Sequence, residues 1–152
     1  MRVHAATWLA LTATIGATAC NPGAMLGRAG AQKERAEHAT ARFRAQLDSA
    51  QFDAIYRETD EDFRNAVTKS RADSLWTMVR RRFGAVRGAH LTAWNVSITT
   101  QGGTQVRLVY QTAFVTDSAV ETFTWRIRGE QPGLLFYNIN SPALLRAMVE
   151  EK

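Results

Sequence analysis

The first half of the chain carries apolar residues at the spacing of three and four that is typical of amphipathic helices. They form one stripe over residues 33–50, which predicts a long helix, and two short helical segments are expected after it. Ser70 and Asp73 have the spacing of a capping box, so a fourth helix is expected to run to Phe83 and to end at Gly84. The apolar residues that define these helices are Ala36, Ala39, Phe43, Leu47, Ala50, Phe52, Ile55, Tyr56, Phe63, Ala66, Val67, Leu75, Trp76, Val79 and Phe83.

After Gly84 the apolar period changes from about 3.6 residues to 2, which predicts β-strands. Trp94 and Ile98 belong to the first alternating run, and consecutive glycines supply the turn that follows it. Ser141 and Pro142 have the N-cap and first-turn pattern of a short C-terminal helix. The expected strands cover residues 94–99, 106–114, 122–128 and 134–140.

Helices that precede antiparallel strands are typical of an α+β domain in which the helices cover one face of the sheet. The pattern resembles the nuclear transport factor 2-like, or cystatin-like, fold, and above all small bacterial lipoproteins of that fold with domains of unknown function. The resemblance implies a cone in which N-terminal helices and a curved antiparallel sheet of about four long strands enclose a pocket. Several members of the family are enzymes, and many others only bind or assemble. The residues that carry the resemblance are Phe43, Leu47, Phe52 to Tyr56, Phe63, Trp76 to Gly84, Tyr110, Phe114, Phe123, Trp125, Phe136 and Tyr137.

The N-terminus has the features of an export signal. Arg2 is the only formally charged residue before Cys20, and residues 5–19 are uncharged and mostly small or apolar. This stretch suits a secretory signal and is short for a membrane span. The segment Ala17-Thr18-Ala19 directly precedes Cys20, the single cysteine, and resembles the lipobox of bacterial lipoproteins. The resemblance implies that residues 1–19 are a signal peptide and that Cys20 receives acyl chains such as palmitate.

Two alternatives to lipidation stay open. Ala17 and Ala19 also fit ordinary signal cleavage, which would leave an unmodified Cys20 at the new N-terminus, and the segment could instead be a retained anchor. Asn21 follows the cysteine, which by resemblance to sorting in enterobacteria favours the outer membrane. The expected location is therefore the bacterial cell envelope, with the protein anchored in a membrane and facing the periplasm.

The segment after the cysteine is expected to be a tether. Residues 20–32 contain glycines and a proline among small residues and have no apolar period, which predicts a flexible link to the membrane. Residues 33–152 are then expected to form a single domain. The whole chain of 152 residues has 45% hydrophobic and 22% charged residues, so disorder and fibrous repeats are excluded.

The composition also excludes several kinds of site. One cysteine rules out an intrachain disulfide framework and a multi-cysteine zinc site. The three histidines have no metal-binding spacing, and no phosphate-binding or nucleophile motif is present, so neither a metal nor a cofactor is expected. The chain carries a net charge of +5 but lacks an aromatic RNA-binding motif, so nucleic acid is not expected as a partner.

The basic residues fall in two groups. The run from Arg80 to Arg82 lies at the expected C-terminus of a helix, where cations complement the helix dipole. Arg107, Arg126 and Arg128 are expected on strand faces opposite the main apolar set. Such a face is either solvated or an interface for an acidic protein partner, and both interpretations stay open.

Catalytic candidates are few. Glu121 shares a strand face with Phe123 and Trp125, and Tyr110 lies on the neighbouring strand, but no histidine or second carboxylate is in register with them. Glu121 is two residues from a turn, so we expect it at the solvated rim of the cone with no marked upward shift of its pKa. The expected pocket lining, which suits a small apolar ligand or a packed core, is Tyr56, Trp76, Tyr110 and Phe136.

The sequence therefore favours a lipid-anchored envelope protein with a non-catalytic binding or assembly role. One alternative is a small pocket enzyme of isomerase or hydratase type that uses Glu121 and Tyr110 as acid and base. The other is an accessory subunit of a membrane complex.

Overall fold

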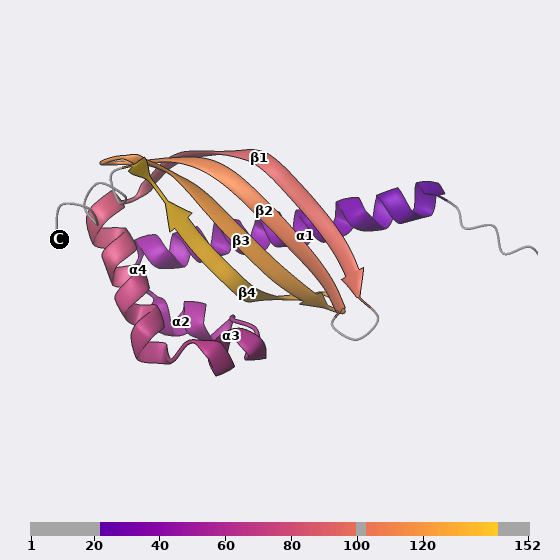
Figure 1. The fold of residues 1–152 in the computed structure, drawn as a ribbon, viewed down its shortest axis with the longest axis horizontal. Helices are drawn as coiled ribbons and strands as arrows, with labels where there is room; N and C mark the ends of the chain where they lie inside the picture. The colour runs from indigo at the N-terminus through magenta and orange to yellow at the C-terminus, as the bar shows by residue number, and fades with distance from the viewer. Residues whose placement is uncertain (1–21, 100–102, 143–152) are drawn as a thin grey trace, which may run out of the picture.

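The computed structural model describes residues 22–99 and 103–142; the signal segment, Cys20 and the expected C-terminal helix lie outside these ranges. Helices precede strands, and the prediction of an α+β fold with a four-stranded antiparallel sheet is confirmed (Figure 1). The helices are α1 (Pro22–Asp48), α2 (Phe52–Arg57), α3 (Glu61–Ala66) and α4 (Lys69–Phe83). The strands are β1 (Val86–Thr99), β2 (Gly103–Phe114), β3 (Ser118–Arg128) and β4 (Gln131–Asn140).

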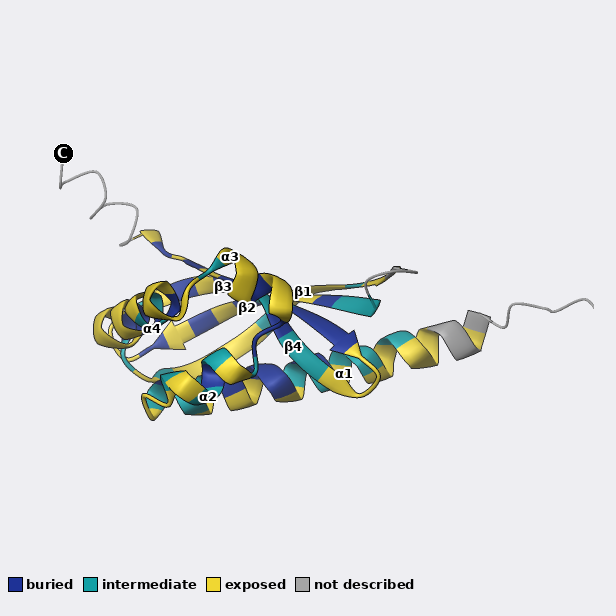
Figure 2. Cartoon of the chain, turned by 90° about the horizontal axis from the view of Figure 1, so that it is seen from below, coloured by how far each residue is buried: buried dark blue, intermediate teal, exposed yellow. Residues whose placement is uncertain are grey.

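The sheet is open and curved, and its strands follow chain order from β1 to β4. Helix α1 crosses one face of the sheet, and α4 lies across one of its ends (Figures 1 and 2). Register explains why this face is covered: Leu108 of β2 pairs with Phe123 of β3, and Val106 pairs with Trp125. Paired residues point to the same side of a sheet, so these four apolar side chains meet the apolar stripe of α1.

The two edges of the sheet differ. At the β4 edge the backbone of the α2–α3 connection adds a short parallel bridge, in which the N–H of Asp60 donates to the carbonyl of Leu134 at 2.8 Å. Gly133 permits this approach, because a Cβ at that position would lie 3.3 Å from Asp60 Cα. At the opposite edge β1 pairs with β2, and within the described part of the chain no other segment pairs with β1.

The core is the one that the apolar pattern predicts. Trp76, Phe83 and Phe123 have no exposed surface and Trp125 has 1%, so their predicted burial is confirmed. Gly84 ends α4 as predicted, with φ of +72°, a conformation that side chains with a Cβ rarely adopt. The period-2 prediction for the second half is confirmed as well, since residues 104–114 and 118–128 are strands.

The predicted flexible tether over residues 20–32 is wrong from Pro22 onward, because α1 begins at that residue. Proline is well suited to the first helical position, where its missing N–H has no partner to lose. The alanines, Met25, Leu26 and Arg28 that follow are strong helix formers and offset the cost of three glycines. A segment without an apolar stripe can therefore still be helical, and in this chain it is a helix that buries little apolar surface.

Two boundaries also differ from expectation. Helix α4 is capped by Thr68, whose side chain accepts a hydrogen bond from the Arg71 N–H, so the capping box at Ser70 is wrong. Strand β1 begins at Val86 and not near Trp94. Irregular register between Val86 and Gly88, and again between Leu91 and Ala93, disturbs the alternation on which the sequence argument relied.

Candidate functional site

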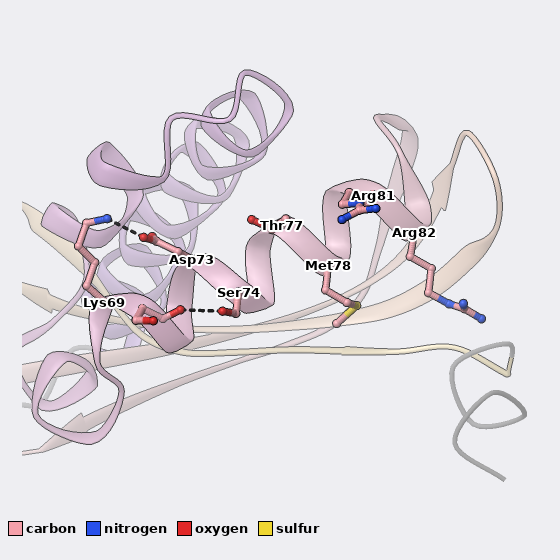
Figure 3. Close-up of a pocket in the computed structure, with 8 residues that line it drawn as sticks. Lys69, Asp73, Ser74, Thr77, Met78, Arg81 and Arg82 are labelled. Carbon is pink, nitrogen blue, oxygen red and sulfur yellow. Dashed lines mark hydrogen bonds and ion pairs between the residues drawn. The ribbon is translucent and has the colours of Figure 1, made fainter. Parts of the chain in front are cut away.

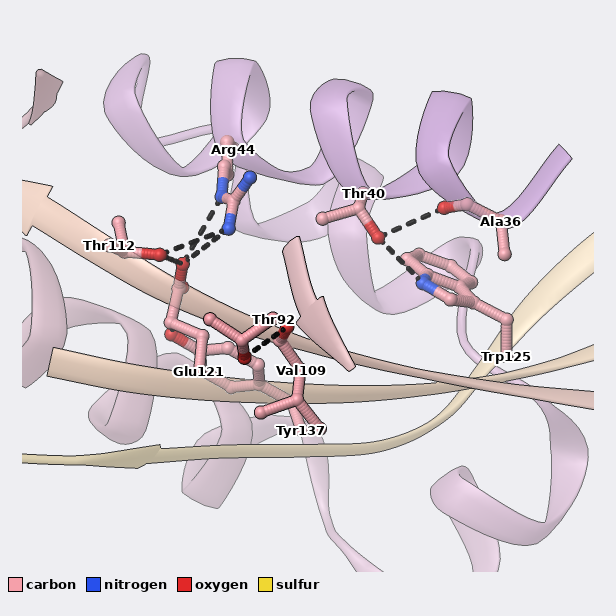
Figure 4. Close-up of polar contacts among 9 residues, drawn as sticks. All are labelled: Ala36, Thr40, Arg44, Thr92, Val109, Thr112, Glu121, Trp125 and Tyr137. Carbon is pink, nitrogen blue, oxygen red and sulfur yellow. Dashed lines mark hydrogen bonds and ion pairs between the residues drawn. The ribbon is translucent and has the colours of Figure 1, made fainter. Parts of the chain in front are cut away.

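Glu121 lies on the inner face of β3 and is fully buried, so the expectation of a solvated rim position is wrong. Its pairing partner Tyr110 is also on the inner face. The alternation that places Glu121 beside Phe123 and Trp125 is correct, but α1 passes over this part of the sheet and removes the carboxylate from water (Figure 4).

Both oxygens of the Glu121 carboxylate accept hydrogen bonds (Figure 4). Oε2 accepts from Arg44 Nη2 at 2.7 Å, from Arg44 Nε at 3.2 Å and from the Thr112 hydroxyl at 2.7 Å. Oε1 accepts from the Tyr137 hydroxyl at 3.0 Å. A buried carboxylate is tolerated when it is paired with a cation and accepts hydrogen bonds, and Glu121 meets both conditions because each of its oxygens has a donor.

Arg44 reaches this position from α1, one residue beyond the buried Phe43. Its guanidinium lies 4.4 Å from the ring centroid of Tyr110 and 5.4 Å from that of Phe123. Only 13% of the Arg44 side chain is exposed. The two charges therefore connect the helix to the sheet in a site shielded by aromatic rings, where an ion pair is little screened by salt.

The tyrosines beside Glu121 are poor acids at neutral pH. Burial raises the pKa of Tyr110 to about 12, with a smaller contribution from the negative charge of Glu37. Burial and then the negative charge of Glu121 raise the pKa of Tyr137 well above 10. An acid–base catalyst works best with a pKa near the working pH, so these groups are suited to holding the carboxylate and not to transferring its proton.

These shifts predict that the domain becomes less stable at alkaline pH. Above pH 10 the tyrosines of the unfolded chain lose protons that the folded chain still holds. The free energy of unfolding therefore falls as the pH rises from 10 towards 12. Below pH 10 these groups do not affect it. Urea unfolding at pH 9, 10 and 11 measures this slope. Tyr137→Phe should make the decline shallower, and an equal slope in the variant would contradict the assignment.

The residues expected to line a pocket do not form one surface. Tyr110 and Trp76 are buried on the inner side, and Tyr56 is half-buried with its hydroxyl donating to the Val67 carbonyl at 3.1 Å. Phe136 pairs with Thr124 on the other face of the sheet and is 51% exposed, so it does not belong to the inner lining.

Aromatic side chains occupy the space between α1 and the sheet. Phe43 contacts Phe123 at 5.3 Å between ring centroids, Tyr137 at 5.0 Å and Trp76 at 6.3 Å. Edge-to-face and tilted contacts of this kind stabilise a packed interior. The inner lining is therefore a filled core around the Glu121 ion pair.

The three strand arginines separate in the structure. Arg107 is exposed on the outer face. Arg126 is buried and its Nη1 donates to Asp60 at 2.8 Å and to Asp62 at 2.5 Å, and Arg128 makes a 3.0 Å ion pair with Asp60. Two of the three charges are thus neutralised within the chain, which weakens the expectation of a continuous face for an acidic partner.

The surface has open depressions away from Glu121. One of about 1040 Å³ follows the outer side of α4, between Lys69 and Arg82, where Lys69 pairs with Asp73 (Figure 3). A second of about 590 Å³ lies among the arginines and carboxylates around Asp60. Neither is lined by Glu121. Among residues 22–99 and 103–142, no three His, Cys, Asp or Glu side chains are grouped as a metal site requires.

Comparison with family models, with curated proteins and with solved structures finds no match to this chain. Across the described ranges, no helix has the length and apolar character required to cross a membrane.

Sequence reasoning found Glu121 and Tyr110 but missed Arg44, Thr112 and Tyr137. A signal for Arg44 was present, because Ala36, Thr40 and Arg44 follow one another at intervals of four along the edge of the buried stripe. Thr40 is fully buried and accepts a hydrogen bond from Trp125 Nε1 at 2.9 Å. Polar residues at two successive turns of this edge, Thr40 and Arg44, indicated hydrogen bonds from the helix to the sheet.

Proposed function

We propose that this protein is a lipid-anchored component of the bacterial cell envelope with a non-catalytic binding or assembly role. The burial and the hydrogen bonds of Glu121 are the observation that supports a non-catalytic role. Its two oxygens are occupied by Arg44, Thr112 and Tyr137, and it lines neither of the depressions described above. A general base needs an oxygen within hydrogen-bond reach of substrate, and Glu121 is fully buried and faces neither depression.

The finer fold assignment belongs to the same proposal. A nuclear transport factor 2-like cone is supported by the order of the elements, by the curvature of the sheet and by the way α1 crosses its inner face. In this chain the interior of the proposed cone is occupied by Phe43, Phe123 and Tyr137. A role that uses the outer surface is therefore favoured over one that uses an internal pocket.

Anchoring at Cys20 is supported by the small residues before the single cysteine and by the uncharged segment that precedes them. Several acyl chains on one cysteine would hold the protein at a membrane durably, since each buried methylene contributes about 0.8 kcal/mol. Helix α1 begins at Pro22, two residues after the proposed anchor.

Substituting the cysteine tests the anchor. In cells that make lipoproteins, Cys20→Ser should move the protein out of the fraction that requires detergent for its release, because the acyl acceptor is lost. Ala41→Ser, an exposed position of α1, is the control and should leave the distribution unchanged. Quantitative blotting of membrane and soluble fractions gives the result, and an unchanged distribution for Cys20→Ser would contradict the proposal.

A further inference from the structure

The β1–β2 hairpin contains a long stretch without charge. Residues 88–106 include no Asp, Glu, Lys or Arg, and the first charged residues on either side, Arg87 and Arg107, are basic and exposed. Exposed edge strands usually carry charges that prevent unwanted contacts, and β1 carries none after Arg87. This composition is unusual for a surface strand in water.

Large apolar side chains of β1 are exposed within this stretch. Trp94 is 48% exposed and Ile98 is 67% exposed. Trp94 pairs with Leu108 and lies four residues from Ile98, so both side chains belong to the inner face of the sheet, where it extends past the packed core. The ammonium group of Lys33 on α1 lies 5.9 Å from the Trp94 ring centroid. Trp94 therefore borders α1 directly.

The same end of the molecule carries the N-terminal turns of α1. Both views show these turns continuing past the sheet at the end where β1 meets β2 (Figures 1 and 2). Leu26 lies in them and is 75% exposed. A helix rises 1.5 Å per residue, so Lys33 is about 17 Å along α1 from Pro22. If α1 lies parallel to the membrane in which Cys20 is anchored, Trp94 is close enough to contact that membrane. If α1 stood upright on the membrane, Trp94 would be too far away.

We propose that Leu26, Trp94 and Ile98 form a membrane-contact edge that lies in the headgroup region of the bilayer in which Cys20 is anchored. The inference rests on the proposed lipid anchor and adds an orientation to it, with α1 parallel to the membrane. Tryptophan is favoured at the boundary between headgroups and acyl chains, because its ring is apolar and its N–H remains hydrated. Arg28, exposed on the N-terminal turns of α1, complements anionic lipid headgroups.

Tryptophan fluorescence reports on this edge selectively. Trp76 and Trp125 are buried in the core, so Trp94 is the exposed indole among the described residues. The protein, isolated from membranes with its acyl group, is placed in vesicles of equal parts phosphatidylethanolamine and phosphatidylglycerol with brominated acyl chains. We expect bromolipid quenching in the wild type that disappears in Trp94→Phe. Ile98→Asp should weaken the quenching, whereas Val115→Asp, at an exposed apolar residue near the opposite end of the sheet, should not.

The outcomes separate this inference from the anchor itself. Acylated protein whose quenching equals that of Trp94→Phe would overturn the membrane-contact edge and leave the anchor intact. Protein without acyl mass would contradict the anchor, and the same measurement on that protein with added vesicles would still decide whether Trp94 meets lipid. Acrylamide quenching of Trp94 is also measured in lipid-free detergent at increasing protein concentration. If the quenching decreases as the concentration rises, a second copy of the chain covers this surface, and the lipid assignment is overturned.

Discussion

Glu121→Ala should lower the free energy of unfolding by about 3–5 kcal/mol, since removing one partner of a buried ion pair leaves the other charge without compensation. The Arg44 side chain, which is 13% exposed, would stay buried against Tyr110 and Phe123 without its partner. The Tyr137 hydroxyl would also lose its acceptor. Urea denaturation of the wild type and the variant, followed by circular dichroism, measures the difference.

Two further variants make this test specific. Glu130→Ala removes the acidic partner of Arg35 in an exposed pair and should cost less than about 1 kcal/mol. The double variant Arg44→Met with Glu121→Leu replaces the buried pair with apolar side chains. It should recover the part of the loss that comes from the unpaired Arg44 charge, while the Tyr137 hydroxyl still lacks its acceptor. If Glu121→Ala costs no more than Glu130→Ala, the carboxylate is not the connection between α1 and the sheet that the structure describes.

Trp125→Ala should also cost about 3–5 kcal/mol, as large-to-small changes in cores do. The indole stacks on Phe123 with ring centroids 6.4 Å apart, and its N–H donates to the Thr40 hydroxyl, so both packing and a buried hydrogen bond are lost. Differential scanning calorimetry gives the change in unfolding temperature, which is then checked against the free energy from denaturant unfolding.

Comparison with other substitutions identifies the source of this effect. Trp125→Phe keeps an aromatic ring but loses the N–H, and it should cost about 1 kcal/mol because Thr40 retains its bond to the Ala36 carbonyl at 2.9 Å. Trp94→Ala removes the same side chain from a half-exposed site and should cost clearly less than Trp125→Ala. Equal losses for the two alanine variants would contradict the core placement of Trp125.

The fold was predictable where periodicity is strong. The stripe on α1, the apolar face of α4 and the alternation in β2 and β3 predict which side chains are buried, and the structure buries most of them. Ala50 is exposed and Leu75 is only partly buried. Thr122 and Arg126, on the opposite face of β3, are buried as well. The start of α1 was not predictable in this way, because residues 22–32 have little apolar surface to bury and the helix there depends on backbone propensity. The start of β1 depends on pairing with β2 across a disturbed register, which no local pattern reports.

The candidate site was predictable only in part. Alternation placed Glu121 on the same strand face as Phe123, but its charge and its nearness to a turn suggested solvent. The partner that permits its burial, Arg44, lies 77 residues earlier in the chain. No spacing along β3 contains that information, since the contact depends on how α1 crosses the sheet.

The measurement that tests the account most directly is the mass of the N-terminal peptide of the mature protein. We expect the peptide to begin at Cys20 and to carry the added mass of acyl chains on that residue. The edge formed by Leu26, Trp94 and Ile98 would then lie beside the membrane that holds the chains. A mature N-terminus without acyl mass, or one that retains the signal segment, would contradict the proposed anchor.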